Sequence, residues 1–201
     1  ARFIGDRGYL VTFENIDPLW VIDLSNPFNP VILGELEVPG VSTYIHPVDE
    51  NTLLTIGIGP GEDGLGLDWS TTQISLFDVS DPTNPTLADS MPISPAYTDD
   101  DCDDIRTCGW SWSWSEATYE HKAFTYWAPA DLLAIPLSTY RYVYDSESLN
   151  YHYEYVSMLK LINVDIENLS LSNHGEVDHS DFYDNEDYWW YSSTSIRRSI
   201  L

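Results

Sequence analysis

The sequence predicts an all-β fold of short antiparallel strands, and three observations support this prediction. The 12 prolines and 11 glycines, many of the prolines in Asp-Pro or Asn-Pro turns, interrupt the chain too often for a long run with helical periodicity. Short runs rich in β-branched and aromatic residues lie between these turns. Two kinds of short segment then recur along the chain, which indicates repeated structural units.

The first expected unit lies near the N-terminus. Its strands are predicted at residues 3–4, 8–13, 19–24 and 31–38, each bounded by turn-forming residues. Four strands of this length form one small antiparallel sheet. With 201 residues, 43% of them hydrophobic, the chain can bury a substantial core against such sheets.

A turn sequence occurs twice. Residues 20–33 read WVIDLSNPFNPVIL and residues 75–88 read SLFDVSDPTNPTLA, with Asp23 and Asp78 in equivalent places 55 residues apart. Asp and Ser side chains bond to nearby backbone N–H groups, and the two prolines fix the turn and start the next strand. Residues 159–168 are a weaker third copy without the prolines.

A second segment recurs before the next strand of each unit. Residues 43–46 (TYIH) and 118–121 (TYEH) each precede an apolar strand, and residues 194–197 (TSIR) begin a further copy. Four short strands per unit, at a period of roughly 45 to 55 residues, are typical of a propeller blade. The sequence therefore predicts a β-propeller fragment of about three to four blades, each a four-stranded antiparallel sheet.

The whole chain, residues 1–201, is expected to be part of one propeller domain. Its blades are predicted at residues 1–40, 41–95, 96–180 with a long insertion, and 181–201 as the start of the next. Both ends read as cuts through the pattern. A blade cannot bury both faces alone, so further blades of the same polypeptide, or self-assembly, are expected to complete the stack.

The charge of the chain excludes several classes of partner. Eight Lys and Arg stand against 33 Asp and Glu, a formal net charge of -25. Such a field repels polyanions, so nucleic acid and anionic membrane surfaces are not expected partners. No apolar run approaches the roughly 20 residues that a membrane helix needs, so no membrane insertion is expected. The same field attracts cations and basic partners, or simply keeps the protein soluble.

Two cysteines, Cys102 and Cys108, lie in an acidic stretch with five residues between them. This spacing in a polar segment favours a local disulfide and an oxidising compartment. Free thiols and a metal site remain alternatives, although no further metal-ligand pair lies nearby in the sequence.

Several segments carry a family resemblance. They read FIGD (3–6), DPLWVIDLS (17–25), LGEL (33–36), SLFDVSDP (75–82), SEATYEHKAF (115–124) and IRRS (196–199). Together they resemble the secreted bacterial and archaeal β-propeller family that is distantly related to WD40 repeats. The resemblance implies the fold and a secreted, extracellular or cell-surface location, and it brings no catalytic residues. Residues 97–114 and 140–155 depart from the pattern.

Alternating carboxylates form a candidate calcium site. Asp99, Asp101 and Asp103 have the spacing that opens a calcium loop. The sixth place lacks the glycine and the twelfth, Trp110, supplies no bidentate carboxylate, so the segment does not match the EF-hand pattern. The two remaining interpretations are a looser calcium site held by the neighbouring cysteines and a solvated acidic loop.

Three side chains take matching places in the second repeat: His46, His121 and Arg197. On the innermost strand of each blade they would ring one mouth of the central channel and bind an anion or, with Glu116 or Glu120, a metal. The alternative is that each hydrogen-bonds within its own blade.

Trp110, Trp112 and Trp114 alternate with serines, so a strand would place three indoles on one face. Such a face suits sugar stacking, a protein hot spot, or packing against a neighbouring blade or subunit.

No catalytic motif accompanies these features: the sequence has no Gly-x-Ser-x-Gly elbow, P-loop or His-Glu-x-x-His. We therefore expect an extracellular binding, scaffolding or assembly module for a protein or a cell-surface polymer. The alternative is a calcium- or other metal-dependent extracellular hydrolase with its site at the channel mouth.

Overall fold

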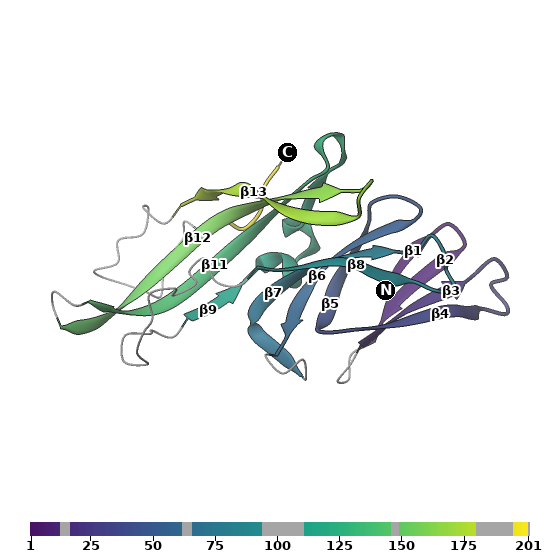
Figure 1. Ribbon diagram of the computed structural model, residues 1–201, viewed down its shortest axis with the longest axis horizontal. Helices are drawn as coiled ribbons and strands as arrows, with labels where there is room; N and C mark the ends of the chain where they lie inside the picture. Colours follow the sequence, from purple (N-terminus) through teal and green to yellow (C-terminus); the bar gives the residue numbers. More distant parts are fainter. Residues whose placement is uncertain (13–16, 62–65, 94–110, 146–148, 180–194, 201) are drawn as a thin grey trace.

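The all-β prediction is confirmed by the computed structural model, which describes residues 1–12, 17–61, 66–93, 111–145, 149–179 and 195–200. The described residues form three antiparallel sheets and three short 3₁₀ helices, with no α-helix among them. Figure 1 shows the three sheets following one another along the long axis of the molecule. None of the described helices is long and apolar enough to cross a membrane.

The first two sheets have four strands each, hydrogen-bonded in chain order. The first consists of β1 (Arg2–Ile4), β2 (Arg7–Val11), β3 (Asp17–Asp23) and β4 (Val31–Val38). The second consists of β5 (Val41–Pro47), β6 (Thr52–Pro60), β7 (Leu67–Asp78) and β8 (Thr86–Ile93). This simple up-and-down order is the order of a propeller blade.

The third sheet repeats this order with one addition. Its main path is β10 (Thr125–Trp127), β11 (Leu132–Asp145), β12 (Asn150–Asp165) and β13 (Ser170–Asp178), and β9 (Ser111–Trp114) also pairs with β11. Between β9 and β10 lie η1 (Glu116–Thr118) and η2 (His121–Ala123), and η3 (Ala128–Ala130) follows β10.

The repeated Asp-Ser turns are structurally equivalent. The Ser25 N–H donates to Asp23 Oδ1 at 2.8 Å, and the Ser80 N–H donates to Asp78 Oδ1 at 2.9 Å. Each turn follows a β-bulge at the matching place, between residues 21 and 22 in the first sheet and between residues 76 and 77 in the second. A bulge between residues 161 and 162 takes the same place in the third sheet. The repeat inferred from the sequence therefore corresponds to one recurring structural unit.

A backbone hydrogen bond also recurs in all three sheets. It ties the end of the third strand to the turn between the first two, through the N–H groups of Leu24, Val79 and Val164. Their acceptors are the carbonyl oxygens of Asp6, Asn51 and Asp131, at 2.7, 2.7 and 2.8 Å. This bond provides a fixed point for comparing positions between sheets.

The core lies between the sheets, because successive residues of a strand face opposite sides. Leu53 packs in the cluster between the first and second sheets, together with Phe77 and Tyr9. Its neighbour Leu54 packs in the cluster between the second and third sheets, together with Leu133. The second sheet is thus covered on both faces, as a blade inside a stack must be.

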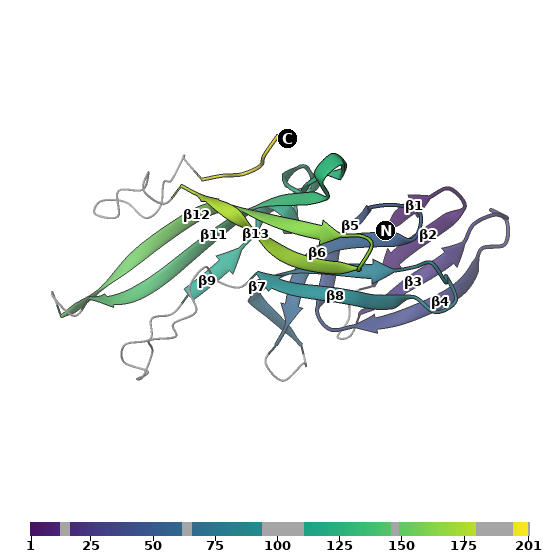
Figure 2. The same ribbon diagram turned by 45° about the horizontal axis from the view of Figure 1, so that its top comes forward.

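The third sheet carries the long β11–β12 hairpin, whose strands pair continuously from Leu132 with Asn163 to Asp145 with Asn150. Figure 1 shows this hairpin reaching beyond the rest of the molecule at its left end. At the outer strands, Figure 2 shows β8 and β13 side by side. They are joined by the Leu171 N–H, which donates to Asp89 Oδ2 at 2.7 Å.

Candidate functional site

An open pocket of about 460 Å³ lies between the second and third sheets, and its walls are mostly apolar. We call it the intersheet groove. The second sheet contributes Ile58, Trp69, Thr71 and Thr72, and the third contributes Trp112, Ser113, Trp114, Ser115, Thr118, Tyr119 and Tyr140. Its volume is within the range of about 300–1,000 Å³ that is common for ligand sites.

The groove depends on a split in the first strand of the third sheet. In the second sheet, β5 runs along β6 with a bulge between Ser42 and Tyr44, opposite Gly57 and Ile56. In the third sheet, β9 ends opposite Ser138 and β10 begins only opposite Ala134. The intervening residues leave the sheet at the place of the β5 bulge and form η1 and η2, which bring Thr118 and Tyr119 to the groove.

Small hydroxyl side chains anchor β9. Ser113 and Ser115 are fully buried. Ser113 Oγ lies 2.9 Å from Thr139 Oγ1, and Ser115 Oγ donates to the Pro136 carbonyl at 2.5 Å. Since strand residues alternate between faces, this anchoring turns Trp112 and Trp114 to the other face together. Trp110, the third indole of the predicted row, lies outside the described residues.

A turn in the second sheet fixes the backbone around Trp69. Asp68 accepts hydrogen bonds from the Ser70 N–H at 2.9 Å, the Ser70 hydroxyl at 2.6 Å and the Thr71 hydroxyl at 2.6 Å. Partial burial raises the pKa of the Asp68 carboxyl, but the bonds from Ser70 and Thr71 outweigh this and hold it below the usual value. The carboxylate thus stabilises the turn that carries the Trp69 side chain.

The aromatic side chains differ in how far they are covered. Trp114 stacks on Tyr140 with ring centroids 5.3 Å apart, and Tyr140 lies 4.7 Å from Tyr155. Trp69, Trp112 and Tyr119 are 60%, 45% and 71% exposed. The groove therefore has one wall of stacked aromatic rings and three aromatic side chains that present much of their surface to solvent.

A smaller, more polar pocket of about 240 Å³ adjoins the groove and shares Trp114 and Tyr119 with it. Glu116, Ser138 and Arg197 are among its lining residues. Burial raises the pKa of the Tyr119 phenol, the Glu116 carboxylate adds to the rise, and the Arg197 guanidinium opposes it. The charges of Glu116 and Arg197 therefore both act on Tyr119, which lines both pockets.

The segment that carries Arg197 is held against the third sheet. The Ile196 N–H donates to Ser157 Oγ at 3.0 Å, and the Thr125 hydroxyl donates to the Ser199 carbonyl at 3.2 Å. Within the described residues, Arg197 has no ion-pair partner. Arg197 is also exposed.

The two predicted histidines belong to a different cluster. The His46 ring lies 5.5 Å from Phe124 and 5.4 Å from Tyr126, and Tyr44 stacks on His121 at 6.1 Å. These residues line the junction of β5 with η2 and β10. Phe124 contacts both Tyr44 and His46, which links the two histidines through one aromatic cluster.

The strand registers do not give His46, His121 and Arg197 the equivalent positions that the sequence repeat suggested. His46 pairs with Leu54, and the matching position in the third sheet is Thr125, opposite Ala134. His121 precedes Thr125 by four residues and lies in η2, because the split of the first strand shifts the register. Arg197 lines the polar pocket instead of joining the two histidines.

Stability is expected to fall on acidification because of His46. Burial lowers the pKa of its imidazole below 6.5, and Arg2 of the first sheet lowers it further. The unfolded chain then binds this proton more readily, so the contribution of His46 is present above about pH 6.5 and is lost as the pH falls from there towards the folded pKa. As the pH falls from 7.5 to 5, the free energy of unfolding of His46→Phe, measured by urea titration, should decrease less steeply than that of the wild type. The exposed His174→Gln serves as control, and equal slopes for wild type and His46→Phe would refute the assignment.

The described residues contain no group of three or more His, Cys, Asp or Glu side chains able to hold a metal ion. Asp99, Asp101 and Asp103 lie outside the described residues, as do Cys102 and Cys108. The calcium site and the disulfide therefore stay predictions from the sequence.

Sequence reasoning found Trp112, Trp114 and Arg197, and the structure brings these three to adjoining pockets. It missed Trp69 and Tyr119. Trp69 follows a glycine-rich stretch and carries no motif, so only the packing of β7 beside β9 reveals its role. The alternation of Trp and Ser did not indicate Tyr119 as a groove residue either, because Tyr119 lies beyond the end of β9.

Comparison with known proteins supports the fold. A family model described as a β-propeller domain matches residues 1–201. An uncharacterized protein of Methanocaldococcus jannaschii is 48% identical over 103 residues, which cover 49% of this chain and 15% of that protein. An uncharacterized protein of Archaeoglobus fulgidus is 49% identical over 85 residues, which cover 42% of this chain and 12% of that protein.

The matched region is thus a small part of each of these relatives. The family model spans the whole sequence, and the three equivalent antiparallel sheets agree with it. The chain belongs to the β-propeller domain family.

Proposed function

We propose that this chain is a binding module of an extracellular β-propeller, without catalytic activity of its own, and that the intersheet groove binds a protein or a cell-surface polymer. One observation carries the proposal: Trp69, Trp112 and Tyr119 come from separate segments and converge, largely exposed, on a single apolar groove. Large exposed apolar patches on folded proteins mark interaction sites.

The charge of the chain narrows the partner. A net charge of -25 opposes nucleic acids and other strong polyanions. Among the described residues that line the groove, only Tyr119 and Tyr140 are ionisable, so the attraction of this lining for a partner depends on shape and apolar contact. The net charge therefore favours a neutral or basic partner, and the lining of the groove favours a partner that makes apolar contacts.

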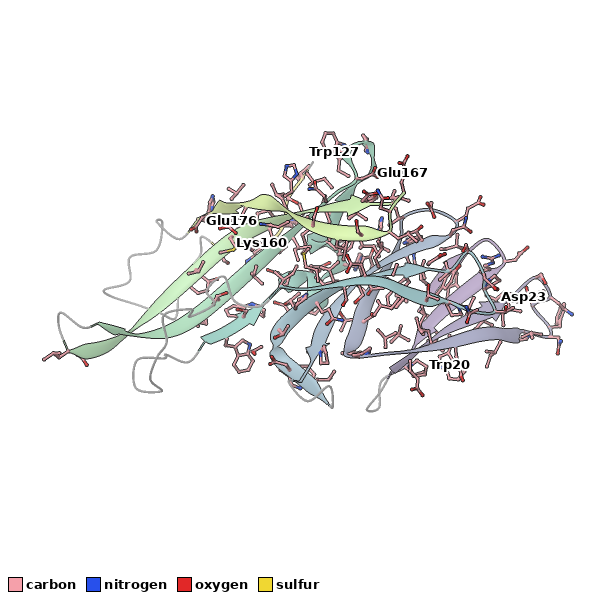
Figure 3. The ribbon with its side chains drawn as sticks, viewed as in Figure 1. Trp20, Asp23, Trp127, Lys160, Glu167 and Glu176 are labelled. Carbon is pink, nitrogen blue, oxygen red and sulfur yellow. The ribbon has the colours of Figure 1, made fainter. Side chains whose placement is uncertain are left out.

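The chain offers a matched test of this proposal. Trp112 is 45% exposed and pairs with Tyr140 of β11. Trp127 is 44% exposed and pairs with Leu132, the first residue of β11. Figure 3 labels Trp127 at the upper edge of the molecule, by the turn between β10 and β11. Replacing either indole by alanine removes a similar exposed surface, but only Trp112 lines the groove.

The whole chain should co-sediment with a cell-envelope fraction of its source organism. The double variant Trp69→Ala/Trp112→Ala is expected to bind at least about tenfold more weakly, because each lost aromatic contact is worth on the order of 1 kcal/mol. Trp127→Ala should bind as the wild type does. Equal retention of all three proteins, or no retention of any, would count against the proposed function.

A further inference from the structure

We infer that the ligand of the intersheet groove is a neutral oligosaccharide chain, which stacks on the exposed aromatic side chains and extends into the adjoining polar pocket. This inference rests on the proposed binding function and names its ligand class. Three independent features of the site support it: the exposure of the aromatic rings, the balance of charge, and the distribution of hydrogen-bonding groups.

The exposure of the rings favours stacking over insertion. A protein hot spot is a well-packed, desolvated pocket that encloses an anchoring side chain. Here Trp69, Trp112 and Tyr119 are 60%, 45% and 71% exposed around an open groove. Rings presented in this way offer broad apolar surfaces, and the C–H-rich face of a pyranose ring packs on such a surface while its hydroxyls stay in water.

The charge balance favours a neutral ligand. Among the described residues that line the polar pocket, one is a carboxylate, Glu116, and one is a guanidinium, Arg197, so these two formal charges cancel. The surrounding chain carries a net charge of -25, which opposes a polymer of uronic acids or sulfated sugars. A neutral sugar chain meets neither a local excess charge nor this opposing field.

The hydrogen-bonding groups of the groove are largely engaged within the protein. Ser113 bonds with Thr139, Ser115 with the Pro136 carbonyl, and the Thr118 hydroxyl with the Ser115 carbonyl. The polar pocket differs, because Arg197 presents guanidinium donors and Glu116 presents carboxylate acceptors. Neighbouring hydroxyls of a sugar both donate and accept, so these two side chains match them.

The two pockets share Trp114 and Tyr119, so one chain molecule can occupy both. Sugar rings would stack on Trp69 and Trp112 in the groove, pass over the shared pair, and place hydroxyls against Arg197 and Glu116. This arrangement uses stacking for affinity and the charged pair for orientation.

The test uses defined neutral hexasaccharides, namely cellohexaose, mannohexaose and the hexamer of β-1,4-linked N-acetylglucosamine, with hexagalacturonate as the acidic comparator. Titration is followed by tryptophan fluorescence and by calorimetry. At least one neutral hexamer should bind saturably, and hexagalacturonate should not. Trp112→Ala should weaken binding about fivefold while Trp112→Tyr retains most of it, and Trp127→Ala should leave it unchanged.

Arg197→Gln provides the second arm. It should weaken binding about tenfold through loss of charged hydrogen-bond donors, without changing the unfolding midpoint, since the side chain has no ion-pair partner among the described residues. Failure of every neutral hexamer to bind, or binding that ignores Trp112→Ala, overturns the saccharide inference.

The envelope experiment separates this inference from the proposed function. If a glucose or mannose hexamer binds, periodate oxidation of the envelopes, which cleaves the vicinal diols of these sugars, should abolish Trp112-dependent retention, whereas protease treatment should not. If only the N-acetylglucosamine hexamer binds, chitinase digestion replaces periodate, because 1,4-linked N-acetylglucosamine has no vicinal diol. If protease abolishes retention and the periodate or chitinase treatment does not, the groove binds a protein: the proposed function then stands and the saccharide inference falls.

Discussion

Replacing Phe77 by alanine is expected to lower the free energy of unfolding by about 3–5 kcal/mol, the usual cost of removing a buried phenylalanine from a core. Phe77 is 1% exposed and lies in the cluster between the first and second sheets, with Tyr9, Leu19 and Leu53. Within the described part of the chain no strand pairing joins these two sheets, so side-chain packing provides most of their contact. The variant therefore measures how strongly one blade holds the next.

Urea unfolding followed by circular dichroism measures the effect. Phe28→Ala is the matched control, because Phe28 is 96% exposed in the repeated turn of the first sheet. That variant should stay within about 0.5 kcal/mol of the wild type. If Phe77→Ala were no less stable than Phe28→Ala, the packing of the first sheet on the second would not contribute to stability as we describe.

Replacing Gly57 by alanine is expected to have the second large effect. It should lower the free energy of unfolding by at least about 3 kcal/mol, the upper end of the usual cost of overpacking. A Cβ atom at Gly57 would lie 1.7 Å from the Val41 carbonyl oxygen and 2.9 Å from the Cα of Ser42. Both atoms belong to the backbone of β5, so no side-chain rotation relieves the contact. To accept alanine, β5 must move away from β6 at the pair that Ser42 forms with Gly57.

Gly66→Ala separates this clash from the general cost of losing a glycine. Nothing lies within 4 Å of a Cβ at Gly66, although its φ of +72° costs an alanine about 1–2 kcal/mol. Gly57→Ala should therefore be the less stable variant in urea, and amide exchange should quicken along β5. A Gly57→Ala protein as stable as Gly66→Ala, with unchanged exchange in β5, would show that the strand is not held as closely as the structure indicates.

The place where β5 and β6 lie close together at Gly57 also differs between the second and third sheets. The bulge beside this glycine marks the place where the third sheet opens its first strand and inserts η1 and η2. The second sheet keeps a closed first strand there. The same repeat thus has one version with a continuous first strand and one version whose split first strand brings Thr118 and Tyr119 to the groove.

The repeating architecture could be predicted from the sequence because its signals are local. Asp23 and Asp78 bond to backbone groups two residues away, and proline restricts its own turn, so equal short segments adopt equal turns. The alternation of Trp and Ser likewise determines that Trp112 and Trp114 share a face once β9 forms. These features need no distant contact.

The candidate site was decided by the tertiary structure. His121 appeared equivalent to His46 in sequence, but ten residues leave the third sheet before β10 and shift the register. Trp69 lies more than 40 residues from Trp112, and Arg197 lies more than 70 residues from Tyr119 in the chain. Such residues meet only when whole sheets stack. Stacking is driven by the burial of apolar surface, and its free energy depends on the buried area and not on how far apart the residues lie in the sequence. The sequence by itself therefore determined the unit and its turns, and the packing of one unit on the next decided which side chains share the groove.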